Sequence, residues 1–206
     1  MIIPSSWGEQ IQVEYDYIKR VNEGLIYGFL LGNARIIFVK AGLGSDHLGY
    51  ENKYLKMAHR LRDKYGCSVI VAANPYDDMS HLEEDKAAIL GYIAEQGFDG
   101  AELMLFGHSN GGSKGLALAY SGINFGKMML VNMPLMINFH KTKRYISAIP
   151  DTSVILVYGE RDPSFSYLGF IKGKFANLKV VEIEGADHTF EGRTQEFISL
   201  PELLFD

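Results

Sequence analysis

The sequence predicts an α/β fold with a mostly parallel, twisted sheet of about eight strands and helices on both faces. Three observations lead to this prediction. Short apolar runs rich in β-branched residues recur along the chain, segments with helical periodicity separate several of them, and the links between them are short. Strand–helix–strand repeats of this kind form parallel sheets through right-handed crossovers.

The predicted strands follow one another from the N-terminus. Residues 11–18 alternate apolar and polar side chains, and residues 24–31 form a second run, so these segments predict an antiparallel hairpin at an edge of the sheet. The later runs are apolar throughout, which is typical of strands buried on both faces. They lie at residues 35–41, 68–73, 102–106, 127–132, 153–158 and 179–183.

Helical stripes fill several of the intervals between these runs. Apolar residues recur with helical spacing at 54–61, 82–93 and 116–119, and a further helix is predicted over 138–148. That last helix occupies the interval between the strands at 127–132 and 153–158. The interval therefore leaves no room for an inserted lid domain.

Composition narrows the class of protein. The chain has 206 residues, of which 47% are hydrophobic and 22% charged, so we expect one domain over residues 1–206 with a full core. A net charge of -5 argues against a nucleic-acid partner. The one cysteine, Cys67, cannot form an internal disulfide or a Cys-rich zinc site. We expect no metal and no cofactor.

The N-terminal residues lack the basic and long apolar segments of a signal peptide. No apolar run reaches the roughly 18 residues that a membrane span needs. We therefore expect a cytoplasmic protein without a membrane partner. An exposed strand at the N-terminal edge of the sheet could pair with a second copy of the chain, so a homo-oligomer is possible, although nothing in the sequence demonstrates one.

Residues with chemical function follow the buried strands. In parallel sheets ligands bind beyond the carboxyl ends of the strands, so these residues are expected at one edge. Gly107-His108-Ser109-Asn110-Gly111 matches G-x-S-x-G, the sharp strand-to-helix turn that exposes a nucleophilic serine. Glycine is required there because larger side chains would clash.

Ser109 needs a base, and the base needs a carboxylate to orient it. His188 follows the last strand in a glycine-containing loop and is the preferred base. Asp162 follows the strand at 153–158 and is the preferred acid, with Glu160 and Asp187 as competitors. The chain order Ser109, Asp162, His188 is the order that the elbow motif predicts.

Three motifs carry a family resemblance: GHSNGG around Ser109, YGERDP around Asp162 and GADHTF around His188. Through them the chain resembles a small, lidless α/β-hydrolase. The resemblance implies that Ser109 attacks a carbonyl and His188 carries the proton. It also implies an oxyanion hole made by the backbone N–H groups of Asn110 and Leu43. One difference is that Ala41-Gly42 stands where many relatives have His-Gly.

The predicted function is hydrolysis of small to medium esters or thioesters through an acyl-enzyme. Gly42, Met133 and Phe165 are the predicted substrate-binding residues, although ordinary packing would also explain the latter two. Amide or C–C hydrolysis and acyl transfer use the same triad and stay open. A non-catalytic small-molecule binder is the alternative from a different class.

Overall fold

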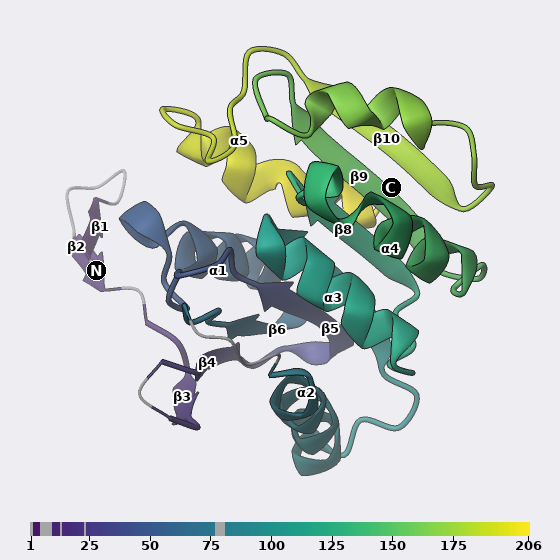
Figure 1. Cartoon of the computed structure of the whole chain (residues 1–206). Helices are drawn as coiled ribbons and strands as arrows, with labels where there is room; N and C mark the ends of the chain where they lie inside the picture. Colours follow the sequence, from purple (N-terminus) through teal and green to yellow (C-terminus); the bar gives the residue numbers. More distant parts are fainter. Residues whose placement is uncertain (1, 5–9, 13, 23, 77–80) are drawn as a thin grey trace.

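The computed structural model describes residues 2–4, 10–12, 14–22, 24–76 and 81–206 (Figure 1). In these ranges the strands are β1 (Ile2–Pro4), β2 (Gln10–Gln12), β3 (Tyr17–Arg20), β4 (Ile26–Leu30), β5 (Asn33–Lys40), β6 (Cys67–Ala72), β7 (Glu102–His108), β8 (Lys127–Val131), β9 (Ser153–Gly159) and β10 (Leu178–Ile183). The helices are α1 (Lys53–Tyr65), α2 (Leu82–Gln96), α3 (Asn110–Tyr120), α4 (Leu135–Ser147) and α5 (Thr194–Ser199), with the short 3-10 helices η1 (Tyr50–Asn52), η2 (Phe165–Phe170) and η3 (Leu200–Leu204).

The main sheet has eight strands in the order β10-β9-β8-β7-β5-β6-β4-β3. All neighbours from β10 to β6 run parallel, whereas β4 is antiparallel to both β6 and β3. The predicted eight-stranded, mostly parallel sheet with an antiparallel hairpin at one edge is therefore confirmed. The carboxyl ends of β5, β7, β8, β9 and β10 share one edge, because these strands are parallel.

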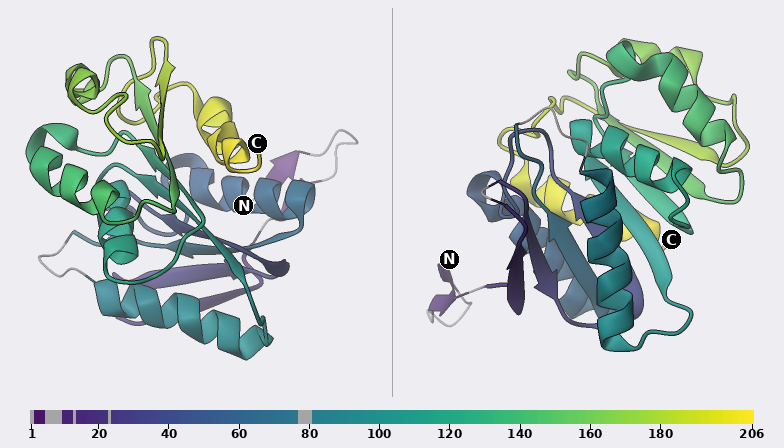
Figure 2. Two further views of the ribbon diagram at one scale, coloured as in Figure 1. Left: turned by 90° about the vertical axis from the view of Figure 1, so that its right-hand side faces the viewer. Right: turned by 60° about the horizontal axis from the view of Figure 1, so that its bottom comes forward.

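Helices cover both faces of the sheet (Figure 2). The strand side chains of one face pack with α2, α3 and α4 in one apolar core, and those of the other face pack with α1 and α5 in a second. This two-sided burial explains why the central strands are apolar throughout. In the described part of the chain, no helix combines the length and the apolar character needed to cross a membrane.

The prediction of one strand over residues 11–18 is wrong. β2 pairs with β1 in a separate two-stranded sheet, and β3 begins only at Tyr17, opposite Phe29. Asp16 explains the break, because its carboxylate accepts the backbone N–H of Leu31 at 2.6 Å and closes the hairpin pairing there. The alternating pattern continues through the break and does not reveal it. Val13 lies outside the described residues.

The connection between β8 and β9 consists of α4 and its flanking turns. The helix begins at Leu135, three residues before the predicted start, because the buried Leu135 side chain packs into the core. Asn138 then has non-helical angles (φ -114°, ψ 20°) that kink the helix. The sequence pattern therefore predicts only the part of the helix that follows this kink. No lid is inserted in this connection, as predicted.

A buried ion pair interrupts the core beside the end of β5. Lys40 is completely buried, and its ammonium donates to the Asp85 carboxylate at 2.8 Å and to the carbonyl of Ala73 at 3.0 Å. The hydroxyl of Tyr27 donates to the same carboxylate at 2.9 Å. Burial raises the pKa of Asp85, and the ammonium of Lys40 opposes that rise. The Lys40–Asp85 pair joins β5 to α2, and the bond from Tyr27 adds β4. Lys40 directly precedes the loop that reaches the candidate site.

We expect Lys40→Met to lower the free energy of unfolding by about 3–5 kcal/mol, because the substitution leaves the Asp85 carboxylate buried without a cation. Urea unfolding followed by circular dichroism measures the loss. Arg35→Met is the matched control on the same strand. Arg35 pairs with Glu102 at 3.1 Å, but these side chains are 40% and 54% exposed, so the control should lose less than about 1 kcal/mol. Equal losses in the two variants would contradict a special role for the buried pair.

Candidate active site

Ser109 occupies the turn between β7 and α3 with φ 54° and ψ -129°. A positive φ is unfavourable for a residue with a side chain, so neighbouring contacts must hold it. Two glycines make the turn feasible. A β-carbon on Gly107 would lie 2.6 Å from the Cα of Gly112, and one on Gly111 would lie 2.3 Å from the carbonyl oxygen of Ala41. The predicted elbow geometry is therefore present.

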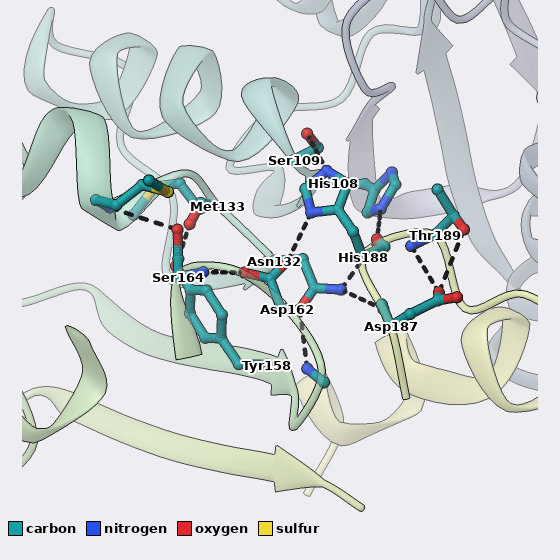
Figure 3. A network of polar contacts seen from close by, with 12 residues as sticks. His108, Ser109, Asn132, Met133, Tyr158, Asp162, Ser164, Asp187, His188 and Thr189 are labelled. Carbon is teal, nitrogen blue, oxygen red and sulfur yellow. Dashed lines mark hydrogen bonds and ion pairs between the residues drawn. The ribbon is translucent and has the colours of Figure 1, made fainter. Parts of the chain in front are cut away.

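The structure brings together the three predicted triad residues (Figure 3). His188 Nε2 lies 2.8 Å from Ser109 Oγ, and His188 Nδ1 lies 2.5 Å from Asp162 Oδ2. The second oxygen of Asp162 accepts the backbone N–H of Ser164 at 2.7 Å. The Asp162 side chain is 1% exposed, whereas the imidazole of His188 is 40% exposed. With Nδ1–H donating to the carboxylate, Nε2 is free to accept the serine proton.

The two competing carboxylates are engaged elsewhere. Glu160 accepts the backbone N–H of Gly185 at 3.0 Å. Asp187 accepts the N–H of Glu191 at 3.0 Å and both the N–H and the hydroxyl of Thr189 at 3.0 and 3.2 Å. Hydrogen bonds from these groups, first of all from the N–H of Glu191, hold the pKa of Asp187 below its usual value. The geometry thus favours Asp162 as the partner of the imidazole.

Two backbone N–H groups are available at the predicted oxyanion positions. In the ranges that the structure describes, neither Leu43 nor Asn110 donates its N–H to a protein acceptor. The side chain of Asn74 fixes their two segments, because its amide donates to the carbonyl of Ala41 at 3.0 Å and to Asn110 Oδ1 at 3.2 Å. Asn74 belongs to no catalytic motif, but its place directly after the strand at 68–73 predicts a position at the rim of the reactive edge, and it reaches the site because β6 ends beside β5.

His108 lines the cavity at Ser109 but is not a member of the hydrogen-bonded triad. Its ring is buried, with Nδ1 3.1 Å from the hydroxyl of Tyr54 and Nε2 3.0 Å from the carbonyl oxygen of His188. The same hydroxyl accepts the N–H of Gly42 at 3.1 Å. Burial, and next the nearby Lys53 ammonium, lower the pKa of His108 to about 3. A neutral His108 with Nε2–H accounts for both bonds and connects the Gly42 loop with the His188 loop.

Asn132, directly after β8, supports the same loop from the other side. Its amide donates to the carbonyl oxygens of Asp187 and His188, each at 3.0 Å, and its Oδ1 accepts the N–H of Gly159 at 2.9 Å. The residue is fully buried with φ 48°, a conformation that Asn tolerates better than most residues. The sequence gives only a weak indication of this role, because it shows no more than an Asn at the end of an apolar strand on the reactive edge.

A cavity of about 200 Å³ opens at Ser109. Of the predicted substrate-binding residues only Gly42 lines it. Met133, directly before α4, is completely buried in the core, and Phe165, the first residue of η2, is half-buried and packs against that core. The residues that line the cavity are Gly42, Leu43, Ser45, Tyr50, Lys53, Tyr54, His108, Ser109, His188 and Thr189.

No protein-family model matches the sequence, and a search of curated proteins finds no match. Solved structures do match. Est1E from Butyrivibrio proteoclasticus has a TM-score of 0.67 at 12% identity, covering 88% of this chain and 93% of that one. An alpha-beta serine hydrolase homologue from Coxiella burnetii has 0.65 at 18%, covering 92% and 96%. The thioesterase domain from the curacin biosynthetic pathway has 0.62 at 14%, covering 89% and 98%. These likenesses confirm the predicted α/β-hydrolase fold.

We expect His108 to make the protein less stable in acid. Between pH 6.5 and pH 3 the unfolded chain binds a proton at this residue and the native chain does not, so stability falls as the pH drops below 6.5. At pH 4.5 the loss from this residue should be about 2–3 kcal/mol. Urea unfolding at pH 7 and pH 4.5, in the wild type and in His108→Gln, measures it.

The His108→Gln variant should be less stable at pH 7, since it loses buried contacts, but less sensitive to acid. His140→Gln, on α4 and far from this network in the fold, is the control and should keep the wild-type acid sensitivity. If His108→Gln and the wild type lost the same free energy between the two pH values, His108 would not be a buried neutral residue.

Proposed function

We propose that this chain, which has the α/β-hydrolase fold, is a serine hydrolase that cleaves ester or thioester bonds of small to medium substrates through an acyl-enzyme. One observation carries the proposal. Ser109 Oγ, the imidazole of His188 and the buried carboxylate of Asp162 form a continuous hydrogen-bonded chain at the mouth of a cavity. An unassisted serine hydroxyl is a poor nucleophile, and this arrangement supplies the base that it needs.

In the proposed first half-reaction, Ser109 Oγ forms a bond to the substrate carbonyl carbon while its proton moves to Nε2 of His188. Asp162 stabilises the resulting imidazolium through Nδ1–H. The tetrahedral intermediate then collapses, the bond to the alcohol or thiol breaks, and the leaving group takes the proton from Nε2. Water repeats these steps in the second half-reaction and releases the carboxylic acid and free Ser109.

The negative charge on the tetrahedral oxygen needs hydrogen-bond donors that are already in place. The backbone N–H groups of Leu43 and Asn110 are proposed to fill that role, since Leu43 lines the Ser109 cavity, Asn110 directly follows Ser109, and neither N–H has a partner among the described residues. Asn74 and the Tyr54 hydroxyl keep this loop in position through their bonds to Ala41 and Gly42. Donation from backbone groups does not require the His-Gly pair found in many relatives.

The size of the cavity supports a small acyl group. About 200 Å³ corresponds to roughly seven water-sized groups, so a short acyl chain fills it. With α4 alone between β8 and β9, no inserted domain covers the entrance from that side. Esters and thioesters of soluble carboxylic acids fit this arrangement better than long-chain lipids.

We expect a fluorophosphonate probe to label the wild-type protein and Ser109→Ala to abolish labelling, because the probe reacts only with an activated serine hydroxyl. In-gel fluorescence measures the label. Ser121→Ala, at the far end of α3, is the control and should label normally. Labelling that persists in Ser109→Ala would contradict the assignment. No labelling of folded wild type would favour the small-molecule binder.

We expect Asp162→Asn to lower kcat for p-nitrophenyl acetate by about 10²–10⁴-fold, because the amide no longer holds His188 in the tautomer that accepts the serine proton. Glu160→Gln is the matched control and should stay within about threefold of wild type, since Glu160 binds a backbone N–H instead of the imidazole. Steady-state kinetics measure both, and circular dichroism checks that each variant folds. The reverse ranking of the two variants would assign the acid to Glu160.

A further inference from the structure

Lys53 lies in the wall of the candidate active site, although the proposed reaction does not use it. It is the first residue of α1, and the whole residue is 8% exposed. It lines the cavity at Ser109 and also a larger neighbouring cavity of about 1010 Å³. Lys53 therefore stands where the two cavities meet.

The ammonium of Lys53 contacts aromatic rings instead of carboxylates. Its Nζ lies 4.3 Å from the centre of the Phe197 ring and 5.5 Å from that of Tyr54. Among the described residues, no carboxylate forms an ion pair with it and no acceptor binds it. Asp187 acts on it only at longer range, and Oδ1 of that residue already accepts three hydrogen bonds. A largely desolvated ammonium without an acceptor is costly unless a ligand supplies one.

Stabilisation of the helix does not explain the lysine. A cation at the N-terminus of a helix opposes the helix dipole, and the first turn of α1 holds no acidic residue that would offset it. Burial lowers the pKa of Lys53 to about 8, and the more distant Asp187 opposes that shift. The group is still mostly protonated at neutral pH. The site thus keeps a positive charge at some cost to folding.

We propose that Lys53 binds a carboxylate of the substrate, so that the preferred substrates are short esters or thioesters carrying one carboxylate in addition to the bond that is cleaved. The inference rests on the proposed hydrolase function. A desolvated ammonium in the same cavity as Ser109 would bind such a group while the carbonyl lies at the serine. A single charge fits better than a phosphate dianion, because three carboxylates line the adjoining cavity and its Arg193 is already paired with one of them, Glu196, at 3.0 Å; the three are Glu51, Glu191 and Glu196.

The test compares two esters that differ only in this charge. One is p-nitrophenyl hemiglutarate, and the other is its isostere with an isopropyl group in place of the carboxylate. We expect wild type to prefer the hemiglutarate, corrected for spontaneous hydrolysis. Lys53→Met should lower the ratio of the two kcat/KM values at least about tenfold, mainly through KM for the charged ester. Lys53→Gln is the second variant, should the first fail to fold.

Lys56→Met is the matched control, since Lys56 lies on the same helix but is not among the residues that line the two cavities. It removes the same charge and should leave the ratio unchanged. A ratio that stays constant in both Lys53 variants would overturn the inference, while hydrolysis of the uncharged ester would leave the proposed function standing. An equal fall in Lys56→Met would also overturn it, because general electrostatics would then explain the effect.

A binding measurement separates the inference from the proposed function. Calorimetry measures the affinity of monomethyl glutarate for Ser109→Ala and for Ser109→Ala/Lys53→Met, in which no turnover occurs. A Kd at least about tenfold weaker in the double variant supports the carboxylate site even if wild type hydrolyses neither ester. Equal affinities, or no binding to Ser109→Ala, would overturn it.

Discussion

The candidate site depends on the close approach of α3 to the end of β5. Ser109 has a positive φ because close backbone contacts constrain the turn. Gly111 lies against the carbonyl of Ala41, and Gly107 lies against Gly112. The same contact brings the N-terminus of α3 beside the loop after β5. One backbone approach therefore sets the direction of the nucleophile and the distance between the two proposed oxyanion donors. A methyl group on Gly111 would collide with the carbonyl of Ala41, and one on Gly107 would collide with Gly112 within the turn.

Buried polar groups then fix the loops around this contact. The hydroxyl of Tyr54 and the neutral ring of His108 connect the Gly42 loop to the carbonyl of His188, and Asn132 binds that carbonyl from the other side. Each of these groups is buried and hydrogen-bonded, and a fully satisfied buried network favours one arrangement of the loops. The 40% exposed imidazole of His188 is thus held by its backbone, while its ring stays open to substrate.

The sequence was sufficient to predict those parts of the structure that follow from local patterns along the chain. Each triad candidate follows a buried strand, and parallel strands bring such positions to one edge, so Ser109, Asp162 and His188 could be predicted to meet. The roles of Lys40, Asn132 and Lys53 could not be predicted, because each depends on contacts with residues that are distant in the chain. Met133 and Phe165 show the converse error. Their apolar character suited a pocket equally well, and only the three-dimensional paths of the segments before α4 and at η2 bring them to the core.

The carboxylates around the larger cavity have a consequence for the end of the reaction cycle. Hydrolysis of an ester or thioester creates a carboxylic acid, which is ionised at neutral pH, so the product carries one more negative charge than the substrate. Glu51, Glu191 and Glu196 line the space beside the Ser109 cavity. Arg193 in the same lining pairs with Glu196 at 3.0 Å, and under the proposed function the repulsion from Glu51 and Glu191 opposes rebinding of the product more than binding of the ester. In the proposed reaction, hydrolysis thus converts a ligand that Lys53 is proposed to bind into one whose added charge these carboxylates repel.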